Sequence, residues 1–267
     1  MSVPKLAANL SFLWTELPFL ERFAAAAEAG FSRVEYMFPY EHPAREIRER
    51  LDDAGLEQVL FNLPAGDWSA GERGIASDPA RAEEFRAGVE QALTYAGELD
   101  VAQLNCLAGL RLDGVAPADQ WSTLVENVRH AARRLTAEGC RLLVEPVNTF
   151  DVPGFLLPTT GNAIRLLDEA GDPAVGLQFD AYHVQRMEGD PARCLRGLID
   201  RVGHVQIADY PGRHQPGTGE IDFSALFTVL DDAGYAGCVG LEYVPDPDAA
   251  ASLDWVSQLG LTLTARN

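Results

Sequence analysis

The feature that most constrains this chain is a set of short apolar runs that each meet an oxygen-bearing side chain. Residues 141–151 read RLLVEPVNTFD, an apolar run that stops at Glu145 and is followed by proline. Because proline cannot donate to a strand ladder and disfavours helix in the residue before it, a strand here should end at Glu145. The same pattern marks three further runs: 175–179 before Asp180, 204–207 around Gln206, and 238–241 before Glu242.

Strand patterns alternate with helical patterns along the chain. Strands are expected at residues 6–10, 34–38, 58–61, 101–107, 141–145, 175–180, 204–209 and 239–243. Helices are expected at 19–29, 44–54, 79–99, 117–138, 159–170, 191–200, 224–233 and 249–259. An eightfold α/β barrel needs about 250 residues, so we expect a single (β/α)8 TIM-barrel domain over residues 1–267. The alternative, an open doubly wound sheet, would carry a phosphate-binding turn after its first strand, and residues 9–12 (NLSF) are not one.

Charge and hydropathy narrow the range of partners. The formal charge is −19, which repels nucleic-acid phosphates, so we expect no nucleic-acid partner. The sequence has no apolar run of about 18 residues, so we expect no membrane span. Widely spaced cysteines and a start without a secretory signal favour a cytoplasmic protein. The apolar string at 259–263 is compatible with a homo-oligomer, a dimer or tetramer.

The strand-end residues predict one metal site. In a barrel the carboxyl ends of the last four strands are adjacent around one rim, so Glu145, Asp180, Gln206 and Glu242 should converge. Crowded carboxylates repel one another unless a cation neutralises them, and oxygen ligands favour Mg²⁺ or Mn²⁺ over zinc. The alternative is that each acid caps a helix or pairs with a surface lysine. We expect a divalent ion and no organic cofactor.

Three further residues are candidates for contacts with a substrate. His183 lies three residues beyond Asp180, on a loop that we expect to cap the same rim, where a neutral imidazole could donate to a substrate oxygen. Arg213 follows the strand of Gln206 and could bind an anion or a sugar oxygen. Asp151 follows Glu145 by six residues. The alternatives are a loop histidine bonded to backbone and solvated loop charges.

Residues 62–76 form a connection that is longer than the usual 2–6 residues or so. Three glycines and Trp68 suggest a flexible lid that excludes water, with Arg73 as a partner for a substrate carboxylate. The glycine pattern is not a P-loop, because no Gly-Lys-Ser/Thr follows. The alternative is a surface excursion without a function.

Longer strings give the sequence a family resemblance. They are ANLS at 8–11, VEYMFPY at 34–40, NLPAGDW at 62–68, AGERGIA at 70–76, LVEN at 124–127, EPVN at 145–148, PGF at 153–155, QFDAYH at 178–183, QRMEG at 185–189, HVQIAD at 204–209, PGTGE at 216–220 and GLEY at 240–243. With these strings the chain resembles the hydroxypyruvate isomerase family almost from end to end. That family lies within the xylose-isomerase-like barrels, which also include ketose 3-epimerases and endonuclease IV.

The resemblance implies an aldose–ketose type isomerase that interconverts hydroxypyruvate and 2-hydroxy-3-oxopropanoate (tartronate semialdehyde) without an organic cofactor. It implies that Glu145 and Glu242 are the acid/base pair, and that these two residues with Asp180 and Gln206 bind the metal. Epimerase relatives commonly have histidine as the third ligand. They place substrate-contacting groups at the positions of His183 and Arg213 and an acid near Asp151.

Other activities stay open from the sequence. A 2-oxo-tetronate isomerase or a ketose 3-epimerase of the same superfamily is the nearest alternative. An endonuclease-IV-like nuclease would need a histidine-rich zinc cluster, and the chain has five histidines in all and a charge of −19. A non-catalytic barrel that binds sugar acids would bind its ligand tightly without turnover.

Overall fold

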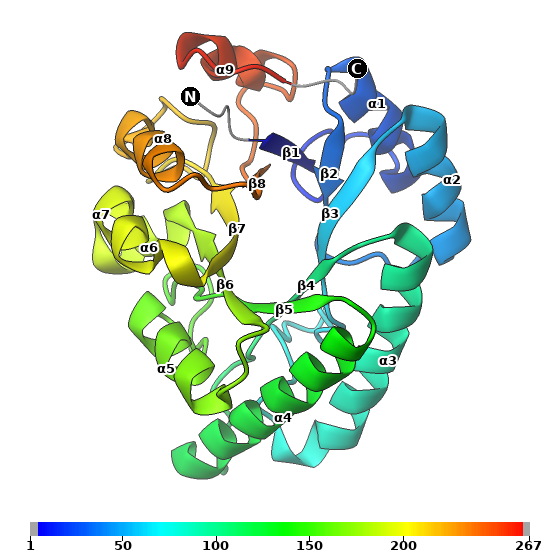
Figure 1. The fold of residues 1–267 in the computed structure, drawn as a ribbon, viewed down its shortest axis with the longest axis vertical. Helices are drawn as coiled ribbons and strands as arrows, with labels where there is room; N and C mark the ends of the chain where they lie inside the picture. Colours follow the sequence, from blue (N-terminus) through cyan, green and yellow to red (C-terminus); the bar gives the residue numbers. More distant parts are fainter. Residues whose placement is uncertain (1–4, 264–267) are drawn as a thin grey trace.

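A computed structural model describes residues 5–263 of the chain. Within this range the strands form a closed barrel in sequence order, and every neighbouring pair is parallel (Figure 1). The prediction of a (β/α)8 barrel is therefore confirmed. The strands are β1 (Lys5–Asn9), β2 (Arg33–Glu35), β3 (Glu57–Asn62), β4 (Gln103–Cys106), β5 (Arg141–Val144), β6 (Val175–Asp180), β7 (Val202–Ile207) and β8 (Cys238–Leu241).

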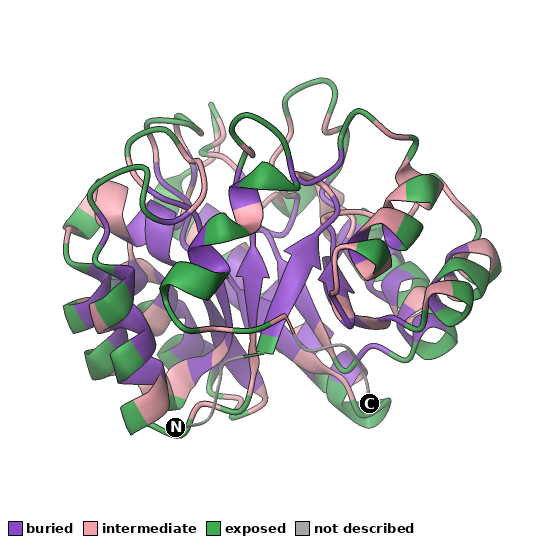
Figure 2. Ribbon diagram, turned by 90° about the horizontal axis from the view of Figure 1, so that it is seen from above, coloured by how far each residue is buried: buried purple, intermediate pink, exposed green. Residues whose placement is uncertain are grey.

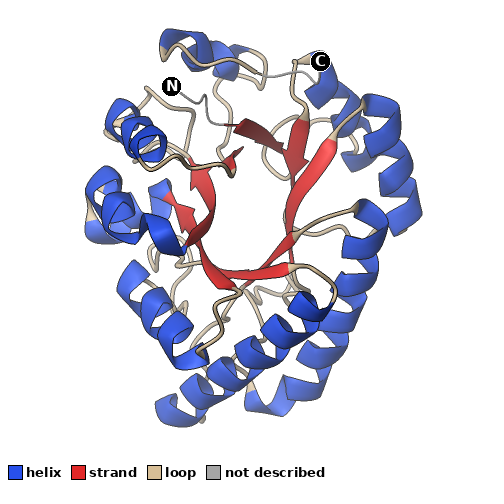
Figure 3. Cartoon of the chain, in the orientation of Figure 1, coloured by secondary structure: helices blue, strands red, loops and turns tan. Residues whose placement is uncertain are grey.

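Helices surround the strands as an outer ring (Figure 3). They are α1 (Arg22–Glu28), α2 (Ala44–Ala54), α3 (Ala82–Leu99), α4 (Pro117–Ala137), α5 (Thr160–Ala170), α6 (Ala181–Glu188), α7 (Pro191–Leu198), α8 (Phe223–Asp232) and α9 (Asp254–Gln258). Short 3₁₀ segments are η1 (Phe19–Glu21), η2 (Pro79–Arg81), η3 (Ile199–Arg201) and η4 (Ala251–Leu253). In the described part of the chain, no helix combines the length and the apolar character that a membrane span requires.

Two predicted segments differ most from the structure, and the bounds of several others differ by one to three residues. The loop expected after Asp180 is wrong, because helix α6 begins directly at Ala181. The Asp180 carboxylate accepts hydrogen bonds from the backbone N–H groups of the first turn and so acts as its N-cap. The strand expected at 34–38 ends at Glu35, where the pairing of β2 with β3 shifts register.

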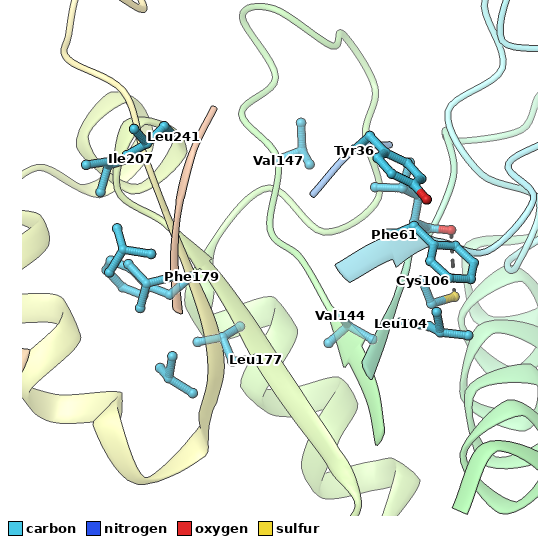
Figure 4. Packing of buried hydrophobic residues seen from close by; sticks show 14 of the residues in the cluster. Tyr36, Phe61, Leu104, Cys106, Val144, Val147, Leu177, Phe179, Ile207 and Leu241 are labelled. Carbon is cyan, nitrogen blue, oxygen red and sulfur yellow. Dashed lines mark hydrogen bonds between the residues drawn. The ribbon is translucent and has the colours of Figure 1, made fainter. Parts of the chain in front are cut away.

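Side chains alternate between the two faces of each strand, and this alternation separates two apolar regions. On β5, Leu142 and Val144 point outward and belong to the large core between the strands and the helices. Figure 4 shows Val144 beside Leu104 in this core, and Figure 2 shows buried strands at the centre with exposed residues on the outer helix faces. Leu143, between them, joins a small cluster with Ala7 from β1 and β3 residues. The barrel wall is therefore apolar on its outer side.

The strand positions that point into the barrel carry many polar side chains, and glycines on other strands make room for them. A Cβ at Gly176 would lie 2.6 Å from an Arg141 guanidinium nitrogen, and a Cβ at Gly240 would overlap the Glu35 carboxylate. Small residues on one strand thus allow long side chains from others to cross the barrel interior. Above this interior layer, at the carboxyl ends of the strands, lies the predicted site.

Candidate active site

The four predicted strand-end residues meet at one rim of the barrel. Glu145 follows β5, Asp180 ends β6, Gln206 lies on β7 and Glu242 follows β8, and all four are buried. Three of them, with His183, Arg213 and Arg73, line a cavity of about 130 Å³. Asp180 lies next to it, with Oδ2 3.6 Å from His183 Nε2. The structure therefore brings the predicted residues together.

Glu145, Asp180 and His183 form a group that could hold a cation. One ligand atom from each of them lies within 4.8 Å of the others. Asp180 Oδ1 accepts the N–H groups of Tyr182 at 2.7 Å and His183 at 3.3 Å. Asp180 Oδ2 is buried and has no hydrogen-bond partner among the described residues. A buried carboxylate oxygen without a donor is costly, so this set of residues fits a positively charged ligand.

Gln206 and Glu242, which also line the cavity, are held by hydrogen bonds. The Gln206 amide nitrogen donates to Glu242 Oε2 at 2.6 Å and to Glu35 Oε1 at 2.8 Å. Its amide oxygen accepts from Gln178 Nε2 at 2.6 Å. Glu242 Oε1 accepts from Arg213 Nη2 at 2.7 Å. Glu242 is thus the carboxylate of the site with the closest cationic partner.

Burial changes the proton affinity of the site. Burial and the nearby Asp180 charge raise the pKa of Glu145 to about 8. Burial raises the pKa of Asp180 to about 6, against the opposing effect of Arg213. Burial also raises the pKa of Glu242, and Arg213 opposes that shift. Burial, together with Arg213 and Arg186, lowers the pKa of His183 well below its usual range. Glu145 and Asp180 can therefore exchange protons near neutral pH, next to a neutral imidazole.

A buried polar layer supports the site from inside the barrel. His204 Nε2 lies 2.6 Å from Glu35 Oε2. Asn9 Nδ2 donates to Glu35 Oε1 at 2.9 Å and to Glu242 Oε2 at 3.1 Å. Asn105 Nδ2 donates to Glu145 Oε2 at 3.0 Å. These supporting residues were not among the predicted site residues. The available signal was that polar side chains also occupy the carboxyl ends of the first four strands: Asn9, Glu35, Asn62 and Asn105.

Two arginines face the cavity. Arg213 has a left-handed backbone (φ 55°), and its guanidinium lies 4.9 Å from the ring centre of Phe12 and 5.1 Å from that of Tyr182. The Arg73 guanidinium stacks 3.9 Å from the ring centre of Trp68, and both residues line the cavity. Residues of the 62–76 connection therefore form part of the cavity wall. That this connection opens and closes as a lid stays a prediction.

Asp151 lies behind His183 rather than beside the carboxylates. Its Oδ2 accepts from the Tyr182 hydroxyl at 2.8 Å and from Asn148 Nδ2 at 2.9 Å. Arg186 Nη2 lies 3.5 Å from its other oxygen. Asp151 thus reaches the site through neighbouring side chains.

Known proteins resemble this chain over nearly its whole length. Residues 23–259 match a family model described as a xylose isomerase-like TIM barrel. The hydroxypyruvate isomerase of Escherichia coli (strain K12) is 47% identical over 252 residues, which cover 94% of this chain and 98% of that protein. The 2-oxo-tetronate isomerase of Cupriavidus necator is 44% identical over 254 residues, 95% of this chain and 98% of that one. A crystal structure from Brucella melitensis, described as an AP endonuclease of family 2, is 44% identical with a TM-score of 0.92, covering 96% of this chain and 98% of that one.

Proposed function

The chain belongs to the xylose isomerase-like TIM-barrel family, and on this basis we propose that it is a single-domain isomerase that interconverts hydroxypyruvate and 2-hydroxy-3-oxopropanoate. The observation that carries the proposal is that Glu145 and Glu242, both buried, line one small cavity. Two carboxyl groups there can take a proton from one carbon of a substrate and return one to the next.

The reaction needs no oxidant or reductant. A base removes a proton from C3 of hydroxypyruvate, and the electron pair of the C–H bond forms the double bond of an enediolate. An acid then delivers a proton to C2, while the hydroxyl proton moves from the C3 oxygen to the C2 oxygen. The product has an aldehyde at C3 and a hydroxyl at C2, and it has the same atoms as the substrate.

The hydrogen bonds suggest which glutamate has which role. Glu242 accepts N–H groups from Arg213, Gln206 and Asn9, which stabilise its ionised form. Burial raises the pKa of both glutamates, but Glu145 accepts from the neutral amide of Asn105 and, among the described residues, from no arginine, so its ionised form is the less stabilised of the two. We therefore assign Glu242 as the base and Glu145 as the acid in the direction that consumes hydroxypyruvate.

A divalent ion fits the site. The ligands would be Glu145 and Asp180, with Gln206 and Glu242 completing the set. Asp180 Oδ2, which is buried without a hydrogen-bond partner in the described residues, supports this assignment, and the oxygen-rich set favours Mg²⁺ or Mn²⁺. When bound, such an ion supplies positive charge that stabilises the enediolate oxygens.

The remaining contacts with the substrate follow from the cavity wall. His183 is placed to donate to a substrate oxygen, and Arg213 or Arg73 to bind the carboxylate that every 2-oxo acid carries. Asp151 would act indirectly, through Asn148 and Tyr182. The cavity of about 130 Å³ is smaller than the roughly 300–1,000 Å³ of sites for drug-sized ligands, which favours a three- or four-carbon acid over a hexose.

A second candidate activity is isomerisation of a four-carbon 2-oxo-tetronate. It is favoured by the 44% identity to the 2-oxo-tetronate isomerase of Cupriavidus necator. The two candidates use the same proton transfers and differ only in the substituent on C3, so the same residues would serve either substrate.

A substrate panel tests the proposal. The purified protein is assayed with hydroxypyruvate, a 2-oxo-tetronate and a ketose, before and after chelation and with Mg²⁺ or Mn²⁺ restored. We expect the highest kcat/KM with hydroxypyruvate. A higher value with the oxo-tetronate would move the assignment to the second candidate. Tight binding of these acids without turnover, under all conditions, would identify a non-catalytic binding barrel.

We also propose a cytoplasmic location. Its support is that the four cysteines, all within the described residues, are free thiols. The dimer or tetramer expected from the sequence stays a prediction.

A further inference from the structure

Asn148 is a buried residue near the cavity, and both polar atoms of its side chain have partners. It follows Glu145 by three residues and is fully inaccessible to solvent. Its amide oxygen accepts the backbone N–H groups of Phe150 at 3.0 Å and Asp151 at 2.9 Å. Its amide nitrogen donates to Asp151 Oδ2 at 2.9 Å and lies 2.7 Å from His183 Nδ1.

These partners fix which end of the Asn148 amide faces the histidine. Turning the amide over would place its NH₂ group against two backbone N–H donors. It would also place its oxygen against the Asp151 carboxylate. Both contacts would then be repulsive, so the amide nitrogen is the atom that faces His183.

The orientation of the amide determines the tautomer of the imidazole. An amide NH₂ group only donates, so His183 Nδ1 must accept and cannot carry a proton. The ring proton of a neutral histidine then lies on Nε2. A lone pair on Nε2, which a metal ion would need, is absent in this tautomer.

The Nε2–H group of His183 points toward the cavity without an internal acceptor at hydrogen-bond distance in the described residues. Nε2 is 3.6 Å from Asp180 Oδ2 and 4.0 Å from Glu145 Oε1, both too long for a hydrogen bond. His183 itself lines the cavity. A ligand oxygen bound there would be the natural acceptor.

We propose that Asn148 is a positioning residue that holds His183 as the Nε2–H tautomer, so that His183 donates to the substrate and is not a metal ligand. The role as donor to a substrate oxygen rests on the proposed function. The tautomer does not, because it follows from the contacts of Asn148 alone.

Nitrogen-15 NMR of histidine-labelled protein, without substrate, tests the tautomer. The signals of His183 are identified as those lost in His183→Gln. We expect a protonated, pyrrole-like Nε2 and an unprotonated, pyridine-like Nδ1, both unchanged in protonation when the diamagnetic ion Mg²⁺ is added. A proton on Nδ1, or a shift of Nε2 that marks direct binding of the ion, would overturn the proposal.

Two variants test the role of Asn148. Asn148→Asp keeps an oxygen for the backbone N–H groups but replaces the NH₂ donor with an acceptor. The proton of His183 should then move to Nδ1, and kcat should fall about 10²-fold. The new carboxylate would face Asp151 Oδ2, which lies 2.9 Å from the amide nitrogen it replaces, so the melting temperature should also fall, and the tautomer is read below that temperature in the folded variant. In the matched control, Asp151→Asn, the amide of Asn148 keeps its backbone partners and the tautomer should not change. An unchanged tautomer in Asn148→Asp, or a switch in the control, would contradict the proposal.

Discussion

Removal of the Arg213 charge tests how the site keeps a base ionised. Arg213 Nη2 lies 2.7 Å from Glu242 Oε1 and 3.9 Å from Asp180 Oδ2. Its charge lowers the pKa of both carboxyls and that of Glu145, in opposition to burial. Arg213→Met keeps a similar apolar stem and removes the charge. The pKa of the base should therefore rise.

The size of the shift follows from the separation of the charges. Two unit charges about 4 Å apart at an effective dielectric constant of about 20 interact by roughly 4 kcal/mol. At about 1.4 kcal/mol per pKa unit this limits the shift to about 3 units. The side chain of Arg213 is only 21% exposed, so screening by solvent is modest. We expect the pKa of the base to rise by about 1–3 units.

The assay is kcat/KM as a function of pH. The base must be ionised to act, so activity is lost below its pKa, and a higher pKa moves the acidic limb of the profile to higher pH. Arg213→Lys, which keeps the charge, should leave most of that limb in place. If Arg213→Met lowers kcat/KM equally at all pH values and the acidic limb does not move, Arg213 binds substrate only and the reasoning is refuted.

Three further predictions concern stability. Burial raises the folded-state pKa of Glu145 to about 8, so the folded state binds its proton more tightly than the unfolded state does. Glu145 should therefore contribute a loss of stability of up to about 5 kcal/mol to the chelated protein as pH rises from about 4.5 to 8. This contribution is the difference between wild type and Glu145→Gln in urea unfolding, because the pKa values of Asp180 and Glu242 are raised as well. A flat profile of this difference would contradict that shift. His204→Leu removes the partner of Glu35 Oε2, while Asn9 and Gln206 still donate to Oε1, and should cost about 3 kcal/mol or more. His204→Gln, which keeps a donor, should cost less, and equal losses would mean that packing dominates. Gly74→Ala should lower the melting temperature and kcat/KM more than Gly71→Ala: both have positive φ, but only at Gly74 would a Cβ overlap a backbone carbonyl. Equal effects would show that φ alone matters.

Much of the fold, and the strand-end carboxylates of the site, could be predicted from local signals in the sequence. Proline after Glu145 and the apolar runs before Asp180 and Glu242 mark strand ends, and strand ends in a closed parallel barrel meet at one rim. The family could also be predicted, because strings such as QFDAYH at 178–183 are specific. These features depend on residues close together in sequence.

The remainder depends on contacts that no local pattern encodes. Glu35 and His204 are 169 residues apart and meet only because the barrel closes. Helix α6 was missed because Asp180 serves both as strand end and as N-cap. Asn148 and His183 are 35 residues apart, and the contact between Asn148 Nδ2 and His183 Nδ1 depends on the orientation of one side-chain amide.

The most direct test of the central claim is proton NMR of hydroxypyruvate in D₂O with the wild-type enzyme and with Glu242→Gln. Proton transfer through a carboxyl that exchanges with solvent predicts deuterium at C2 of the semialdehyde formed by the wild type. It also predicts that Glu242→Gln, correctly folded, converts hydroxypyruvate about 10²–10⁴-fold more slowly. Conversion without solvent deuterium, or a Glu242→Gln variant as fast as the wild type, would contradict the proposed mechanism.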